Sequence, residues 1–407
     1  MIKVAIEHAD NYRLETIKEV LKRCFSDIGL PDNIPFSKYI KPGNRVFIKP
    51  NWVASKWRES CPHKDTLYSV ITHPAVIEAV TDFVAEALQG EGEIIIGDNP
   101  SIDADFEELM DFTQIRKIED KYKVKTSILD LRPLVCENLV NYGKRNLMTP
   151  KVGDPLGKVE INLGKDSMFY GMDSKRFRGV FEERDETVAS HSGENQLYTF
   201  AKSLYDADVY ISIPKMKTHQ KVGATLNLKG LVGSILNKNQ LVHWQVGYPE
   251  IGGDEYSSKE EWEVGQAAKV KHRGAWSGND TIWRMVVDLY KAMLLKNRVY
   301  FSVVDGIIAG EGQGPFCPTS KNANTLICGE DLFAVDCVTA RYMGLDPKKI
   351  KYLSYFLEQE EYGVNYKTME IICENKIKEN FFEDESRYSD FFVIEQWKSV
   401  QYRKNKR

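Results

Sequence analysis

The segment "ISIPKMKTHQKVGATLNLKGLVGSI", residues 211–235, contains the transition that defines the fold, because an apolar run ends there and cationic side chains follow. The run that ends at Ile213 has the β-branched character of a strand. Lys215, Lys217 and His219 come directly after it, and Lys229 lies in the glycine-containing stretch that follows. Ligands of open parallel sheets bind beyond the carboxyl ends of the strands. The segment therefore predicts a strand that ends at a cationic site.

Runs of the same kind recur along the chain and end in polar or turn-forming residues: "RVFIKPN", "GEIIIGDNP", "RVYFSVVDG" and "NTLICGED". They alternate with amphipathic segments of helical period at residues 72–88, 280–295 and 331–345. This alternation predicts an α/β fold with a mainly parallel or mixed sheet flanked by helices.

The same pattern suggests four parts. Residues 1–116 form a first α/β part, and residues 117–193, where the pattern weakens, form an insertion or small subdomain. Residues 194–346 form a second α/β part that carries the Lys/His cluster. Residues 347–407 are predicted to be a helical, charged C-terminal segment that ends in a solvated tail.

Composition narrows the class of protein. The 407 residues carry a formal net charge of −4, which gives no general attraction to nucleic acid or anionic membranes. No apolar run reaches the roughly 20 residues of a membrane span, and the N-terminus resembles no signal peptide, so a cytoplasmic location is predicted. The seven cysteines are odd in number and form no CxxC pair, which favours reduced thiols over disulfides or metal frameworks. Composition leaves the oligomeric state open.

Polar residues after two of the strands predict an anion clamp. Lys49 and Asn51 follow "VFI", while Lys215 and Lys217 follow "ISI", so both pairs are expected at one volume that suits a carboxylate or phosphate. The alternative is that each lysine is a solvated strand-end charge. Lys229 follows glycines that permit close backbone approach, although glycines used for helix packing explain that stretch equally well. The chain has no Walker loop and no GxGxxG motif.

Four histidines, His73, His219, His243 and His272, lie in loop-like or helix-start contexts and are acid/base candidates, with a capping or surface role as the alternative. His219 lies among lysines that would lower its affinity for a proton and leave it a neutral base.

Carboxylates that could balance these positive charges also follow strands of the predicted sheet. Asp98 and Asp305 end strands and Glu311 follows in a glycine-rich stretch, so each could hold a divalent metal such as Mg²⁺, accept a proton or pair with a lysine. Asp336 lies within an apolar helix and needs a partner if it is buried, and we expect that partner to be a lysine of the site.

Together, "VFIKPNW", "THPAVIEAV", "IIIGDNP", "ADVYISIPKMKTH", "LNLKGLVG", "VVDGIIAGEGQGP" and "DLFAVDCVTARYMGLDP" resemble the family catalogued as domain of unknown function 362, in order from about residue 45 to 347. The residues that match its motifs are Lys49, Asn51, His73, Asp98, Lys215, Lys217, His219, Asn227, Lys229, Asp305 and Asp336. The resemblance implies kinship of fold and no particular reaction. Some relatives carry ferredoxin-type iron–sulfur motifs, but this chain has none, so no iron–sulfur cluster is expected.

A weaker likeness is to the lactate racemase family, whose nickel-pincer nucleotide is held covalently by a lysine. Thr72 and His73 before a helix, His219 after a strand and Lys229 ten residues later match its layout, and His243 lies near where another functional histidine would fall. "LNL" replaces that family's Gly-Gly-Ala, and "KPNW" replaces its Asp/Arg-rich motif. These departures argue against the nucleotide on Lys229, whose presence the mass of the intact protein would reveal.

Two functions follow from the sequence. The first is an enzyme, racemase- or epimerase-like, that acts on an anionic small molecule in a cleft, with acid/base candidates His219, His73 and Lys229. Its predicted substrate-binding residues are Lys49, Asn51, Lys215, Lys217, Asn227 and His243. The alternative is a non-catalytic protein that binds an acidic ligand or glycan. Its aromatic platforms, or simply core residues, would be Trp244, Tyr248, Trp276 and Trp283.

Overall fold

The computed structural model describes residues 1–268, 273–384 and 389–402, and it is built around one mixed sheet. The strand order is β17-β16-β1-β15-β14-β10-β2-β3-β4, and β11 and β12 extend the sheet beside β14. The strands are β1 (Ile2–His8), β2 (Arg45–Pro50), β3 (Glu93–Asp98), β4 (Lys125–Asp130), β10 (Val209–Ile213), β11 (Lys215–His219), β12 (Gly223–Thr225), β14 (Val299–Gln313), β15 (Cys317–Gly329), β16 (Met369–Cys373) and β17 (Lys376–Ile377). The predicted α/β fold is confirmed.

Parallel pairing brings the ends of the central strands together. β14, β10, β2, β3 and β4 pair in parallel, whereas β15 runs antiparallel to both β14 and β1. In the register of β10 with β2, Ser212 lies opposite Lys49. The carboxyl ends of β2, β3 and β10 therefore share one edge, as the sequence predicts.

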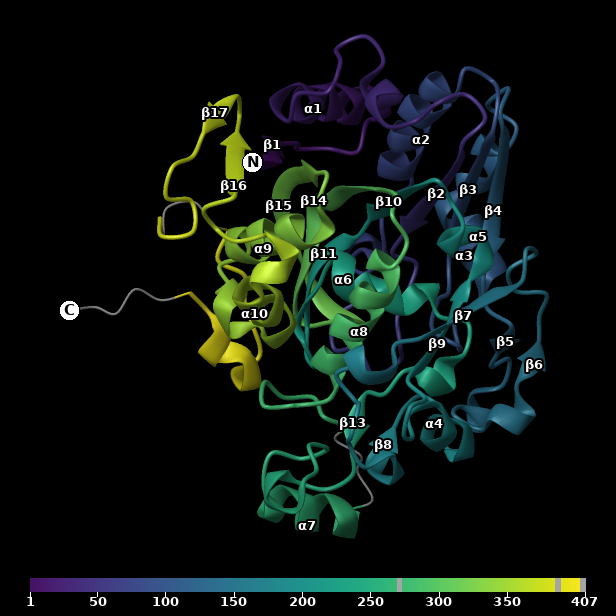
Figure 1. Ribbon diagram of the computed structural model, residues 1–407, viewed down its shortest axis with the longest axis vertical. Coiled ribbons are helices and arrows are strands. Elements are labelled where there is room, and N and C mark those ends of the chain that lie inside the picture. Colours follow the sequence, from purple (N-terminus) through teal and green to yellow (C-terminus); the bar gives the residue numbers. More distant parts are fainter. Residues whose placement is uncertain (269–272, 385–388, 403–407) are drawn as a thin grey trace.

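Helices cover both faces of the sheet (Figure 1), because successive side chains of each strand point to opposite sides. On β2, Val46 and Ile48 pack in one core while Phe47 packs in the other. The first core includes α1 (Leu14–Asp27), α2 (Pro74–Leu88) and α3 (Phe106–Thr113). The second includes α6 (Asn227–Gly230), α8 (Ile282–Leu294), α9 (Leu332–Tyr342) and α10 (Lys351–Glu358).

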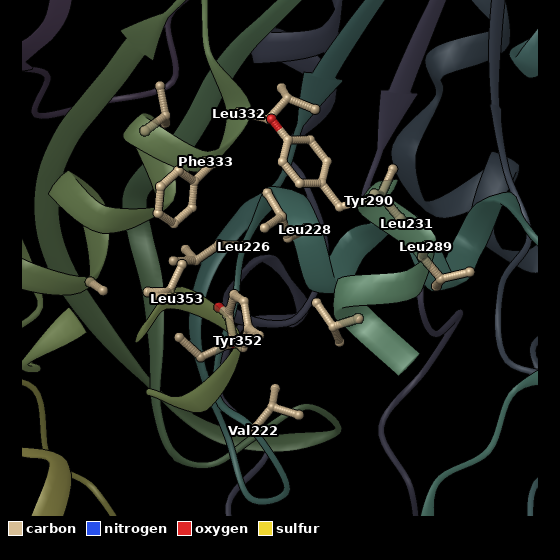
Figure 2. Close-up of a cluster of buried hydrophobic side chains, with 14 of the residues drawn as sticks. Val222, Leu226, Leu228, Leu231, Leu289, Tyr290, Leu332, Phe333, Tyr352 and Leu353 are labelled. Carbon is tan, nitrogen blue, oxygen red and sulfur yellow. The ribbon is translucent and has the colours of Figure 1, made fainter. Parts of the chain in front are cut away.

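The short helix α6 is held by apolar contacts (Figure 2), since four residues give too few helical hydrogen bonds to fix it alone. Leu226, Leu228 and Leu231 are fully buried in the same cluster as Leu289 of α8 and Phe333 of α9. This core fixes the position of Lys229, which directly follows the buried Leu228.

The predicted insertion at residues 117–193 begins later than expected. β4 lies within that range but pairs with β3 as the edge strand of the main sheet. Beyond Asp130 the chain forms three small two-stranded sheets. They pair β5 (Leu134–Val135) with β6 (Thr149–Pro150), β7 (Lys158–Asn162) with β9 (Leu197–Ala201), and β8 (Phe177–Arg178) with β13 (Trp244–Gln245). The remaining helices are α4 (Asp185–Ser190), α5 (Lys202–Tyr205) and α7 (Lys259–Ala268).

The C-terminal segment is more than a charged helical tail, and that prediction was wrong for most of it. β16 pairs in parallel with β1, and Phe381, Phe391 and Trp397 are buried in the main core. Residues 385–388 and 403–407, the second of which form most of the predicted solvated tail, lie outside the described residues.

Two of the cysteines are not reduced thiols, which corrects the prediction from composition. Cys61 and Cys317 form a disulfide across 256 residues of sequence, a separation that the cysteine spacing could not reveal. Cys24, Cys136, Cys328 and Cys337 are free thiols. Within the described residues, no helix combines the length and the apolar character that spanning a membrane would require.

Candidate functional site

A cavity of about 520 Å³ lies at the carboxyl ends of β2 and β3. Among the described residues its walls carry cationic side chains and one carboxylate, that of Asp98. The cations are Lys49, Lys217, Lys221, Lys229, Lys238, Arg58 and Arg273, and His219 and His243 also line the cavity. The walls therefore hold far more positive than negative charge.

Lys49 and Asp98 form the one ion pair inside the described cavity wall. The Lys49 Nζ donates to Asp98 Oδ1 at 2.8 Å, and both side chains are almost completely buried. Asp98 also accepts hydrogen bonds from the backbone N–H groups of Trp52 and Asn99. Gly233 packs directly on this pair, where a Cβ atom would overlap Asp98 Oδ1. Asp98 therefore forms an ion pair in the cavity wall, which is one of the three roles that its sequence context allows.

Lys217 is held by oxygen atoms without a full negative charge. Its Nζ donates to the carbonyl of Val70 at 2.5 Å and that of Pro315 at 3.3 Å, and lies 3.5 Å from Asn51 Oδ1. Burial lowers its pKa well below the usual lysine value, and the charges of Lys215 and Lys229 lower it further. Asn51 and Lys217 therefore lie together in the cavity, as predicted.

Three further lysines bring charge that no described carboxylate within salt-bridge distance neutralises. Burial and Lys49 lower the pKa of Lys229 to about 8. Burial is also the main cause that lowers the pKa of Lys238 and of Lys221 to about 7. Lys238 donates to the carbonyl of Asn99 at 3.2 Å, and the ammonium of Lys221 lies 4.9 Å from the ring centre of Trp244. An anion in the cavity would supply the missing countercharge.

The two histidines of the cavity hold opposite tautomers in their neutral forms. His219 Nδ1 accepts the backbone N–H of Lys221 at 3.0 Å, so its ring proton is on Nε2. His243 Nδ1 lies 2.8 Å from the carbonyl of Leu241, which can only accept, so Nδ1 carries the proton and Nε2 keeps a lone pair. Burial, followed by nearby lysines, lowers both pKa values well below the usual histidine range. Both rings are therefore neutral at neutral pH. His272, a further acid/base candidate, lies outside the described residues.

Lys215, Asp305 and His73 do not line this cavity, which corrects the prediction of one shared site. Lys215 Nζ donates to Asp305 Oδ2 at 2.5 Å, and both residues are completely buried. Asp305 also accepts from the Tyr12 hydroxyl and the His73 backbone N–H. The His73 ring caps α2 by accepting from Ala75 N–H and stacks on Tyr12, and burial lowers its pKa to about 4. This is a closed cluster around an ion pair.

Asp336 is buried as expected, but its partner is not a lysine. Its carboxylate accepts hydrogen bonds from the backbone and side chain of Asn227 and from the backbone of Leu228, all between 2.8 and 2.9 Å. Burial raises its pKa to about 7. Asn227 thus holds α6 against α9 and lies outside the cavity. Glu311 is also outside, where it pairs with Lys321 at 3.4 Å.

Sequence reasoning missed several cavity residues. Arg58 lies in a loop and Lys238 begins a three-residue 3-10 helix, so neither has a strand or helix period, and only their spatial neighbours show their relevance. Of the aromatic residues considered as platforms, Trp244 lines the cavity, whereas Trp276 and Trp283 do not. Tyr248 is likewise outside it. Tyr142 and Phe316, which the sequence did not single out, supply further aromatic wall.

The fold and site together define an α/β protein with a cationic cavity at the carboxyl edge of its sheet. The chain belongs to the family described as Domain of unknown function (DUF362), which it matches over residues 46–161 and 131–341. The predicted membership is confirmed.

Individual relatives are distant. A thylakoid-associated protein of Synechocystis sp. is 24% identical over 368 residues, which cover 90% of this chain and 81% of the relative. A Thermotoga maritima protein of known crystal structure aligns with a TM-score of 0.36 at 11% identity, over 86% of this chain. The lactate racemase apoprotein of Thermoanaerobacterium thermosaccharolyticum aligns with a TM-score of 0.36 at 10% identity, over 84% of this chain. The alignments span 60% and 57% of those two solved chains.

Cofactor binding stays a prediction. In residues 1–268, 273–384 and 389–402, no three His, Cys, Asp or Glu side chains converge in a way that could hold a metal ion. Lys229 and His219 both line the cavity.

Proposed function

We propose that this protein is an enzyme that binds an anionic small molecule in the cavity and moves a proton at an atom of that molecule. The observation that carries the proposal is the imbalance of charge in the cavity walls, where five lysines meet one carboxylate among the described residues. A buried charge without a countercharge destabilises a protein, so such a charge is expected only where a function needs it. The simplest such function is the binding of a negatively charged substrate.

The two histidines suit proton transfer because their free ring atoms differ. The lone pair on His243 Nε2 can accept a proton, while the Nε2–H of His219 can donate a hydrogen bond to an oxygen where negative charge builds up. Lys229, with a pKa of about 8, can exchange a proton near neutral pH. These groups are consistent with racemisation or epimerisation next to a carboxylate, carbonyl or hydroxyl.

The test is incorporation of solvent deuterium. The protein is incubated in D₂O with a panel of 2-hydroxycarboxylates and sugar phosphates, and each compound is followed by NMR for deuterium at carbon. We expect at least one compound to exchange, and expect His243→Gln to abolish exchange while binding is retained. A compound that binds without exchange, and whose binding depends on the lysines and Trp244 but not on either histidine, would support the non-catalytic binding protein instead.

The cytoplasmic location and the absence of nucleic-acid and membrane partners remain part of this proposal. The acidic net charge of −4 supports the absence of a general affinity for polyanions. Anion binding is thus assigned to the cavity alone.

A further inference from the structure

The directions from which the lysines approach carry information about the shape of the ligand. Lys49 comes from the end of β2, Lys217 from β11, Lys229 from α6 and Lys238 from the short 3-10 helix before β13. Lysine is a compact point charge, whereas a planar carboxylate is best matched by the planar fork of arginine. Cations that converge from several elements suit a tetrahedral group, whose oxygens also point in several directions.

A buried hydroxyl in the cavity adds a hydrogen-bond donor. Thr225 lines the cavity and is only 5% exposed, and its Oγ1 has no hydrogen-bond partner among the described residues. A buried hydroxyl without a partner is unfavourable, so a ligand oxygen at this place would satisfy it. Gly230 borders the same space, and a Cβ atom built on it would meet nothing within 4 Å. The wall beside Lys229 is therefore open to a ligand.

The cavity is larger than one small ion requires. Its volume of about 520 Å³ lies within the range of roughly 300–1,000 Å³ that holds drug-sized ligands. Tyr142, Trp244 and Phe316 also line the cavity and can contact an organic group. The space therefore has room for an anionic group and the molecule that bears it.

We propose that the ligand is a phosphate ester whose tetrahedral dianionic group is held by Lys229 and Lys238, near the Lys49–Asp98 pair, with a hydrogen bond from Thr225. This inference rests on the proposed function, because it names the class of anion that the cavity takes. Two negative charges match Lys229 and Lys238, which are two of the four cavity lysines without a described carboxylate partner, whereas a monocarboxylate would leave one of these two uncompensated.

Calorimetric titration of the full-length protein with sulfate, phosphate, acetate and malonate tests the assignment. Sulfate is a tetrahedral dianion that does not titrate near neutral pH, and malonate is a dicarboxylate of equal charge. We expect sulfate and phosphate to bind at least tenfold more tightly than malonate, with acetate weakest. Lys229→Met and Lys238→Met should each lower sulfate affinity at least tenfold. Lys165→Met, at an exposed position outside the cavity, should leave it unchanged.

The outcomes separate this inference from the proposed function. If malonate or acetate binds as tightly as sulfate, and the Lys229 and Lys238 variants abolish that binding, the phosphate ester is ruled out while an anion site remains. If none of the four anions binds, both proposals fail. Circular dichroism of each variant distinguishes loss of a contact from loss of the fold, and Thr225→Val supplies a second variant that removes the hydroxyl at nearly constant volume.

Discussion

The cavity and the Lys215 cluster contain the same kinds of residue, yet their surroundings differ. Around Lys215 the charges balance, because Asp305 pairs with the lysine and accepts from Tyr12 and the His73 backbone. In the cavity, Lys229 and Lys238 have no described carboxylate partner. The first arrangement is complete without a ligand, whereas the second is not. The comparison indicates that residue type alone does not mark a site, and that uncompensated charge does.

The largest expected effect is on the closed cluster. Lys215→Met leaves the fully buried carboxylate of Asp305 without its cation, so we expect the free energy of unfolding to fall by about 3–5 kcal/mol. Urea denaturation followed by circular dichroism measures this loss. The double variant Lys215→Met/Asp305→Asn should recover part of it. A Lys215→Met protein as stable as wild type would show that this cluster is not what stabilises the region.

A smaller loss of stability is expected when the hydrogen bonds that hold α6 are weakened. Asp336→Asn places an amide where a carboxylate accepts three N–H groups from Asn227 and Leu228, so at least one donor loses its acceptor. We expect stability to fall by about 1–3 kcal/mol. Sulfate binding should also weaken, because α6 carries Lys229. Thermal unfolding and calorimetry of the same sample report both effects, and unchanged values in both would refute this role for Asp336.

The smallest expected effect is that of pH on sulfate affinity. Lysine attracts an anion when protonated, below its pKa, so affinity should decline as pH rises through the pKa of about 8 for Lys229 and about 7 for Lys221 and Lys238. Between about pH 7 and about pH 9 the affinity for sulfate should fall roughly tenfold or more. Lys49 and Arg273 are cations near these groups, and Asp98, Asp254 and Glu255 are the nearby carboxylates. Affinity that is constant over this range would contradict a lysine-based site.

The sequence predicts the sheet and part of the site, because parallel strands bring their ends together whatever the detail of the loops. Lys49, Asn51 and Lys217 accordingly line one cavity. Lys215 could not be separated from Lys217 in advance. On β14 the partner advances from Asp305 at Lys215 to Gly310 at Lys217, and this irregular register gives the two lysines different neighbours.

Other features depend on contacts that have no local signal. The disulfide joins Cys61 to Cys317 through folding of the whole chain, and the partner of Asp336 comes from a segment more than 100 residues away. Lys238 begins a 3-10 helix of only three residues, which is too short to give a helical period in the sequence. Such pairings follow from tertiary packing, which single-sequence periodicity does not encode.

The most direct test of the central claim compares melting temperatures of wild type and the double variant Lys229→Met/Lys238→Met, with and without sulfate. Exclusion of sulfate from protein surfaces stabilises both proteins alike, so the difference between them reports binding to the cavity. We expect the double variant without sulfate to melt no lower than wild type, because the removal of two buried, uncompensated charges offsets the lost hydrogen bond from Lys238 to the Asn99 carbonyl. We expect sulfate to stabilise wild type more than the double variant. Two results together would contradict the claim that these lysines bind a ligand. The double variant would melt well below wild type without sulfate, and sulfate would raise the melting temperatures of both proteins equally.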